Sequence, residues 1–259
     1  MTAAAGPGRR IAVITGGSSG IGAALARRLA ARGWCCVLLA RREQRLRPLA
    51  REIRGEHEVC DVGDRAAVER VAAAVRRRHP AIALLVNCAG IPGRRGFLEL
   101  QPERIEEVLR VNYLGAVWSL AAFLPALEAA SPARVVNIVS VAGVVALPSS
   151  GPYAASKHAE LAFSRAAAVD LRHRGLRVHT VNPGFVETEG FPQTRLLRNR
   201  VLRHIVARPE LVAERVLDAL DTGRQEIFVP WWYRGAMVVE GLAPGLVGRL
   251  AGRRDLSPA

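Results

Sequence analysis

Short apolar runs alternate with segments of helical pattern along this 259-residue chain, and this alternation limits the possible folds more than any other feature. Several of the runs are apolar without polar alternation, which is typical of strands covered on both faces of a parallel sheet. They lie at Arg10–Ile14, Cys35–Ala40, Glu56–Cys60, Ile82–Val86, Arg134–Val139, Leu176–Val181 and Glu226–Val229. We therefore predict an α/β fold with a doubly wound parallel sheet of about seven strands and helices on both faces.

The segments between the runs carry helix signals. Ala23–Ala31 is rich in Ala, Leu and Arg and is followed by Gly33, and Asp64 is placed to cap a helix over Ala66–Arg78. The sequence contains no Pro/Ser-rich linker and no break in composition. We expect a single domain over residues 1–259.

The chain is strongly basic, with 37 Lys and Arg against 23 Asp and Glu and a formal charge of +14. The arginines are spread over several predicted helices, alternate with acidic residues in several stretches, and lack the interleaved aromatics of single-strand binders. We interpret this charge as a solvated surface and expect no nucleic-acid partner. Only one of the 37 basic residues is a lysine, Lys157.

The cysteines and histidines indicate neither a disulfide framework nor a metal site. Cys35, Cys36, Cys60 and Cys88 lie in apolar runs, as buried thiols of a reducing compartment do. Residues 1–10 lack the apolar region of a signal peptide, and no uninterrupted apolar stretch reaches the roughly 18 residues of a membrane span. We expect a cytoplasmic protein without a bound metal.

A glycine cluster, Thr15–Gly22, joins the first predicted strand to the first helix. Its glycines at 16, 20 and 22 let the backbone approach a pyrophosphate, whose charge then lies at a helix N-terminus. In this position the cluster predicts a Rossmann-like dinucleotide site. The residues expected to contact the cofactor are Gly16, Ser18, Ser19, Gly20 and Ile21.

The end of the second strand indicates which cofactor binds. An acidic residue there accepts from the ribose 2′-hydroxyl of NAD, whereas this chain has Arg41 and Arg42, which can pair with a 2′-phosphate. We favour NADP(H) over NAD(H); in the alternative, the two arginines simply open an exposed helix. Asp61 and Val62 are placed to meet the adenine. Asn87, Ala89 and Gly90 are expected beside the adenosine ribose.

Tyr153 and Lys157 are four residues apart, so on a helix they share a face. A compact ammonium can lie among the hydroxyls of a sugar, a place for which a guanidinium is not suited. It also favours the phenolate and should lower the pKa of a neighbouring phenol. This pair predicts an acid/base group beside the bound cofactor.

Together these residues resemble the short-chain dehydrogenase/reductase family in its form of about 250 residues, over roughly Arg9 to Val229. The resemblance rests on Thr15–Gly22, Asp61, Asn87–Gly90, Asn112, Ser140, Tyr153–Lys157 and Asn182–Gly184. It implies a nicotinamide cofactor and a catalytic set of Asn112, Ser140, Tyr153 and Lys157. It also implies cofactor contacts from Pro183, Gly184, Val186 and Thr188, and assembly into a homodimer or homotetramer.

The chemistry expected of such a site is hydride transfer between the nicotinamide and a carbonyl or secondary alcohol. Tyr153 would exchange the proton, Ser140 would donate to the developing oxyanion, and Lys157 would hold the ribose and tune the phenol. Asn112 would hold a water behind Lys157. With NADP(H), carbonyl reduction is the expected direction.

Two later segments bear on the substrate. Residues 188–208 are expected to form a lid whose apolar residues and arginines suit an apolar ketone, an acyl chain on an acidic carrier, or simply an amphipathic surface helix. The apolar tail 230–259 opens with Trp231 and Trp232. We favour packing within the protein or its oligomer over contact with a membrane surface.

Two alternative functions remain. A non-catalytic nucleotide-sensing or scaffold protein could keep the glycine cluster without the catalytic set. A peripheral membrane reductase of lipid-like carbonyls would use the tail as its lipid contact.

Overall fold

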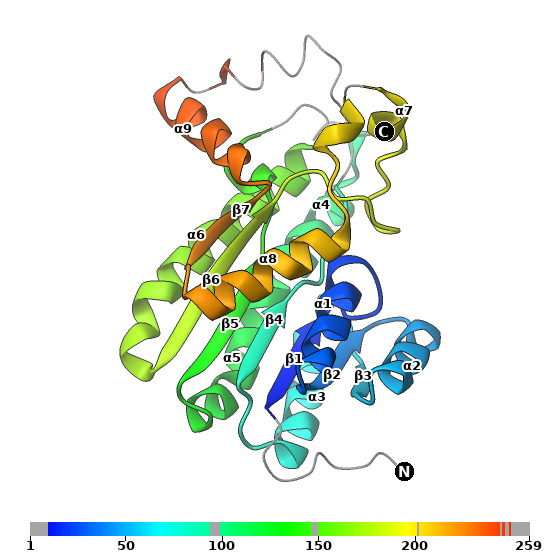
Figure 1. Cartoon of the computed structure of the whole chain (residues 1–259), viewed down its shortest axis with the longest axis vertical. Coiled ribbons are helices and arrows are strands. Elements are labelled where there is room, and N and C mark those ends of the chain that lie inside the picture. Colours follow the sequence, from blue (N-terminus) through cyan, green and yellow to red (C-terminus); the bar gives the residue numbers. More distant parts are fainter. Residues whose placement is uncertain are drawn as a thin grey trace.

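The computed structural model describes residues 10–93, 99–146, 150–200, 202–243, 245–246 and 249. Within these residues seven parallel strands form one sheet in the order β3-β2-β1-β4-β5-β6-β7 (Figure 1). The strands are β1 (Ile11–Thr15), β2 (Cys35–Ala40), β3 (Glu56–Val59), β4 (Leu84–Asn87), β5 (Ala133–Ile138), β6 (Leu176–Pro183) and β7 (Glu226–Val229). The predicted fold class is confirmed, and β2 and β7 have the predicted bounds.

Helices cover both faces of the sheet (Figure 1). One face carries α1 (Gly20–Ala31), α2 (Glu43–Glu52) and α8 (Pro209–Thr222), and the other carries α3 (Arg65–Arg78), α5 (Gly115–Ala129) and α6 (Gly151–Asp170). Side chains alternate between these two cores along each strand. In β1, Ala12 and Ile14 face the first core, whereas Ile11 and Val13 face the second. The strands are continuously apolar because helices cover both faces of the sheet.

The shorter helices lie around the edge where the strands end. These are α4 (Pro102–Leu109), α7 (Thr194–Arg198) and α9 (Arg234–Leu242). A π-helical turn, Arg110–Leu114, joins α4 to α5 and contains Asn112. Such turns are frequent at functional sites.

One helical segment, Pro102–Ala129, is long and apolar enough to cross a membrane by length and composition alone. Its α5 part packs on the sheet, where Phe123 and Leu127 are fully buried beside β4 and β5. We assign it to the core of this domain.

The order of the strands determines where a ligand can bind. β1 lies between β2 and β4, so the chain reverses direction across the sheet at β1 and β4. Loops leaving these two strands diverge and open a crevice at their carboxyl ends. Thr15 ties the two strand ends together: its hydroxyl donates to Val86 O at 3.3 Å and accepts from Cys88 N at 3.0 Å.

Parts of three predictions lie outside the described residues. These are the absence of a signal peptide, which concerns mostly residues 1–9, the contribution of Val201 to the lid, and much of the tail beyond residue 243.

The predicted cap of α3 is confirmed and can be tested. The Asp64 carboxylate accepts from Ala66 N at 2.9 Å and from Ala67 N at 3.3 Å. We expect Asp64→Ala to lower the free energy of unfolding by about 1 kcal/mol because two helical N–H groups lose their acceptor. Asp64→Ser keeps an acceptor and should stay within a few tenths of a kcal/mol of wild type. Equal losses in the two variants, measured by urea denaturation, would contradict this role.

Candidate active site

A cavity of about 550 Å³ lies at the carboxyl ends of the strands, and its wall contains nearly all of the predicted site residues. These are Gly16, Ser18, Ser19, Gly20, Ile21, Arg41, Arg42, Asp61, Val62, Ala89, Gly90, Ser140, Tyr153, Lys157, Pro183, Gly184, Val186 and Thr188. Asn87 and Asn112 lie behind the wall rather than on it. The structure therefore brings together residues from the ends of six strands and from α6.

The glycine cluster has the shape that a dinucleotide requires. Gly16 and Gly20 have φ values of +67° and +54°, which residues with side chains rarely adopt. A Cβ on Gly16 would lie 2.8 Å from the backbone of Ala89, and one on Gly22 would lie 2.4 Å from Gly16 O. Only glycine permits this close approach, which leaves Ser18, Ser19 and Gly20 on the cavity wall where α1 begins. These residues fit a pyrophosphate.

Arg41 and Arg42 reach the cavity from the end of β2, as predicted. In this structure Arg42 donates to the Glu189 carboxylate at 2.8 Å and to Ser19 Oγ at 3.2 Å. Arg41 lies 3.9 Å from the Asp61 carboxylate. Glu189, which the sequence analysis did not single out, follows β6. It forms a second ion pair with Arg45 at 2.9 Å.

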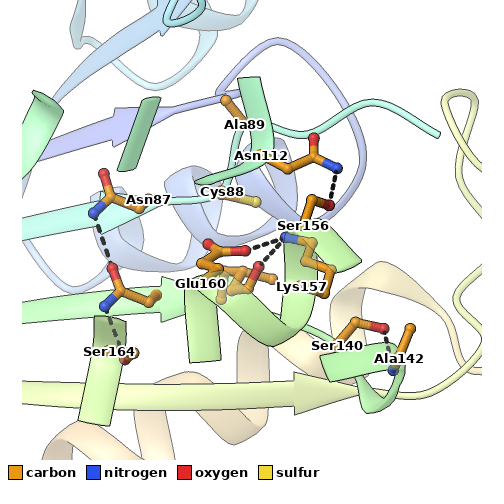
Figure 2. A network of polar contacts seen from close by, with 12 residues as sticks. Asn87, Cys88, Ala89, Asn112, Ser140, Ala142, Ser156, Lys157, Glu160 and Ser164 are labelled. Carbon is orange, nitrogen blue, oxygen red and sulfur yellow. Dashed lines mark hydrogen bonds and ion pairs between the residues drawn. The ribbon is translucent and has the colours of Figure 1, made fainter. Parts of the chain in front are cut away.

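Tyr153 and Lys157 lie on α6, one turn apart, and both face the cavity. The Lys157 ammonium is 5.9 Å from the centre of the Tyr153 ring. It donates to Ile138 O at 3.0 Å and to Glu160 Oε2 at 2.6 Å (Figure 2). The predicted pair is therefore present, but the ammonium is also held by two groups that the sequence analysis did not use.

Burial changes the predicted state of the phenol. We expected Lys157 to lower the pKa of Tyr153, and both the ammonium and a hydrogen bond with Ser140 do act in that direction. Desolvation is the larger effect, so the pKa of Tyr153 is raised above its ordinary value in this structure. The prediction of the net direction was wrong because a sequence does not show how deeply a phenol is buried. In this structure the Tyr153 hydroxyl is therefore protonated at neutral pH.

Ser140 follows β5, on the wall of the cavity with Tyr153. Its Oγ accepts from Ala142 N at 3.1 Å (Figure 2). The hydroxyl also donates to Pro183 O at 3.4 Å. These two backbone contacts orient the hydroxyl at the carboxyl ends of β5 and β6. From there it can donate to an oxygen that also meets the Tyr153 hydroxyl.

Asn112 does not line the cavity but supports it. Its side-chain oxygen accepts from Ile91 N at 2.8 Å, and its Nδ2 donates to Ile91 O at 3.0 Å. The same Nδ2 donates to Ser156 Oγ at 3.0 Å (Figure 2). The hydrogen bonds of Asn112 thus link the loop after β4 to α6. The water that we expected Asn112 to hold stays a prediction.

Asn87 requires a correction. We expected it beside the adenosine ribose, but its side chain is buried and donates to Asn137 Oδ1 at 2.9 Å. Asn137 in turn donates to Ser164 Oγ at 2.9 Å (Figure 2). The side chain of Asn87 therefore belongs to a polar network between β4, β5 and α6. The alternation of side chains along a strand directs it away from the cavity.

The segment after β6 closes the other side of the cavity. Gly184 allows the ring of Tyr233 to lie directly against the backbone, because a Cβ at this position would be 2.1 Å from Tyr233 Cε2. Val186 pairs with Ala207 and Thr188 with Phe191 in isolated bridges. The predicted cofactor contacts Pro183, Gly184, Val186 and Thr188 are thus held in place from both sides.

Only the first part of the predicted lid lines the cavity. Gly190, Phe191 and Gln193 are on the wall, and the Phe191 ring lies 5.4 Å from that of Tyr153. Farther on, Leu196 is buried and Leu197 is exposed. The exposed arginines of this segment are Arg198, Arg200, Arg203 and Arg208. The described side chains after Gln193 are not on the cavity wall, and the role of this part of the segment as a lid stays a prediction.

The described part of the tail is divided between packing and exposure. Tyr233 is buried with Val141 and Phe228, in agreement with the predicted packing within the protein. Trp231 and Leu242 are 80% and 83% exposed, and Val238 is also exposed. In the isolated chain these apolar side chains face solvent.

No group of three or more His, Cys, Asp or Glu side chains that could hold a metal ion occurs in the described residues.

Comparison with known proteins identifies the family. The family described as short chain dehydrogenase matches residues 10–197. A granaticin polyketide synthase putative ketoacyl reductase of Streptomyces violaceoruber is 34% identical over 233 residues, covering 86% of this chain and 85% of that protein. The human short-chain dehydrogenase/reductase 3 is 30% identical over 243 residues, covering 91% of this chain and 80% of that protein.

Solved structures agree. A variant of actinorhodin polyketide ketoreductase with NADPH has a TM-score of 0.77 and is 31% identical, covering 87% of this chain and 97% of that one. A short-chain dehydrogenase/reductase from Burkholderia phymatum in complex with NAD has a TM-score of 0.81 and is 26% identical, covering 90% and 93%. The similar structures thus include complexes with either cofactor.

Proposed function

The chain belongs to the short-chain dehydrogenase/reductase family, and we propose that it is an NADP(H)-dependent ketone reductase for apolar or acyl-type substrates. The observation that carries the proposal is the arrangement of Ser140, Tyr153 and Lys157 on one cavity whose nucleotide end carries Arg41 and Arg42. A nucleotide-sensing or scaffold protein would need only part of this arrangement.

The cofactor site fits a nicotinamide dinucleotide. Ser18, Ser19 and Gly20 would hold the pyrophosphate, Asp61 and Val62 the adenine, and Lys157 the nicotinamide ribose. Pro183 to Thr188 would orient the ring. When bound, the reduced cofactor supplies the hydride that the carbonyl carbon accepts.

The protein's own contribution to the reaction is proton transfer and stabilisation of charge. The Tyr153 hydroxyl donates its proton to the carbonyl oxygen as that oxygen gains negative charge. Ser140 donates a hydrogen bond to the same oxygen, which lowers the energy of the transition state. The Lys157 ammonium then stabilises the phenolate left on Tyr153. Because its pKa is raised, Tyr153 holds its proton at neutral pH and can donate it to a carbonyl oxygen.

The preference for NADP(H) is supported by the two guanidinium groups at the end of β2. Arg42 already contacts two groups with oxygen acceptors, Ser19 and Glu189, at the mouth of the nucleotide end. A 2′-phosphate can replace Glu189 there as the anion, with Arg41 beside it.

The substrate class is supported by the wall beyond Tyr153. Ile91, Pro92, Val141, Phe185 and Phe191 give this part of the cavity an apolar surface. Arg104 lies at the same wall, where it donates to Pro92 O at 3.1 Å. An apolar ketone suits the apolar wall. An acyl chain that bears a phosphate or carboxylate suits both the apolar wall and Arg104.

Assembly and compartment complete the proposal. The long helices α5 and α6 leave partly buried apolar side chains such as Trp118 and Phe163 on the outside of the second core. We expect them to pack in a homodimer or homotetramer.

All four cysteines lie within the described residues and form no disulfide there, which suits the cytoplasm.

The reaction can be tested with Tyr153→Phe across a panel of aldehydes, aryl ketones, steroids and 3-ketoacyl thioesters. We expect the variant to lose at least about 100-fold in kcat because it lacks the proton donor. Its NADPH dissociation constant, measured by fluorescence, should change less than about threefold. Substantial remaining turnover would show that another group moves the proton. Tight NADPH binding by wild type without turnover of any carbonyl would favour the sensing role.

The cofactor preference can be tested with Arg42→Asp and Arg41→Asp. A charge-assisted hydrogen bond contributes about 1.5–3 kcal/mol, so each variant should shift the ratio of kcat/KM for NADPH and NADH towards NADH by about 10- to 100-fold. Arg47→Asp makes the same charge change on α2, outside the cavity, and should leave the ratio within about threefold. An unchanged ratio in both cavity variants would contradict the 2′-phosphate assignment.

A second candidate, action at a lipid surface, is favoured by one observation. Trp231, Trp232, Val238 and Leu242 expose apolar side chains at one end of the molecule. Aromatic and aliphatic residues of this kind enter the boundary of a bilayer, and the basic net charge favours anionic lipid.

Sedimentation with phosphatidylserine vesicles tests this candidate. If the lipid contact forms, Trp231→Glu and Leu242→Glu should each reduce the bound fraction by about tenfold in partition coefficient, because each removes a large apolar side chain. Val169→Glu, an exposed apolar position on α6, serves as the control. If the wild-type protein stays in the supernatant at low salt, the lipid contact is contradicted. The exposed apolar residues of the tail would then be assigned to packing between subunits.

A further inference from the structure

A buried carboxylate lies directly beside the catalytic lysine. Glu160 follows Lys157 by three residues on α6, so both side chains lie on the same face of the helix. Glu160 is 1% exposed and Lys157 is 4% exposed. The distance between Lys157 Nζ and Glu160 Oε2 is 2.6 Å (Figure 2). Neither the predicted catalytic set nor the proposed reaction gives Glu160 a role.

The ion pair fixes the ammonium. With Ile138 O at 3.0 Å and Glu160 at 2.6 Å, two of its three donors are used. The third is left for the cavity, where the ribose and Tyr153 are expected. Glu160 therefore determines where the ammonium lies and how much of its positive charge acts on the phenol.

The charge of the buried group gives the direction of the effect. With Glu160 ionised, Tyr153, Lys157 and Glu160 together are neutral while the phenol is protonated, and they carry −1 once a proton leaves. With an uncharged residue at position 160 the same step goes from +1 to neutral. A buried net charge is unfavourable, so the carboxylate opposes loss of the proton. This direction is the same whether the proton leaves Tyr153 or Lys157.

We propose that Glu160 is a positioning residue that holds the Lys157 ammonium and so keeps Tyr153 in the protonated form that donates to a carbonyl oxygen. The inference rests on the proposed function for its chemical meaning. It relates the pH range in which Tyr153 can donate its proton to another residue of this chain.

The other titratable group facing this cluster is Cys88, from the loop after β4 (Figure 2). Burial raises the pKa of its thiol to about 12, so it is neutral at physiological pH. Burial also raises the pKa of Glu160 to about 7, an effect that Lys157 opposes. Because the pKa of Tyr153 is raised, the phenol ionises in the range where Glu160 already carries its charge. Glu160 is therefore ionised over the pH range in which Tyr153 loses its proton.

The test is a titration of Tyr153 in the cofactor-free protein, followed by ultraviolet difference absorbance of tyrosinate. Subtracting the Tyr153→Phe signal removes the contributions of Tyr113 and Tyr233. In Glu160→Gln we expect the midpoint of Tyr153 ionisation to fall by about one pH unit or more, which is a tenfold or greater loss of proton affinity. Glu160→Asp keeps the charge and should stay closer to wild type than the Gln variant.

Glu56→Gln is the matched control. Glu56 is a buried carboxylate on β3 that pairs with His79 at 2.9 Å and lies outside the cavity. Its loss should lower thermal stability without moving the Tyr153 midpoint. If Glu160→Gln does not fold, Glu160→Met, of similar length and without polar atoms, repeats the test. An unchanged midpoint in a folded, uncharged variant, or equal midpoints for Asp and Gln, would overturn the proposal.

Kinetics give the second readout. In Glu160→Gln the pH above which carbonyl reduction declines, and the pH above which alcohol oxidation begins, should both move down with the Tyr153 midpoint. Loss of stability alone would lower both rates without moving either limb. Failure of every carbonyl to turn over would overturn the proposed function, whereas the tyrosinate titration tests Glu160 without turnover.

Discussion

The whole molecule depends on the parallel pairing of its strands. Parallel neighbours need crossover connections, so helices cover both faces and every strand ends at the same edge of the sheet. The loops after β1, β4, β5 and β6 therefore meet although they are far apart in the sequence. The glycine cluster, Ser140 and the segment from Pro183 to Thr188 come together for this reason. Helix α6 adds Tyr153 and Lys157 from the second face.

Burial determines the chemistry at that edge. The same low-dielectric surroundings raise the pKa of Tyr153 and of Glu160, and they make the Lys157 ion pair short and strong. An ammonium without a buried counter-ion would tend to lose its proton. With Glu160 beside it the pKa of Lys157 is raised, and the charge stays available for the ribose and for the phenolate. In our proposal Glu160 thus links the charge of Lys157 to the protonation of Tyr153.

The strands could be predicted from the sequence because their apolar runs are visible without tertiary context. Site residues could be predicted where backbone geometry or chemistry requires one residue type. Gly16 and Gly20 are examples of the first kind, and Tyr153 and Lys157 of the second. The prediction for Asn87 was wrong because the side chain points away from the cavity at this position of β4. Its amide lies in a buried polar network instead. Of the predicted lid, described residues up to Gln193 reach the cavity, and the role of the rest stays a prediction.

The sequence by itself determined the fold class and the family and predicted Tyr153 as the proton donor, because periodicity, glycine positions and the Tyr–Lys spacing are local properties of the chain. Only the tertiary structure decided which groups surround that donor. The spacing of Glu160 from Lys157 was visible in the sequence, but its burial was not, and burial is what makes the charge of each group act strongly on its neighbours. The net pKa of Tyr153 depended on the same depth, which results from the packing of helices on the sheet rather than from any local pattern.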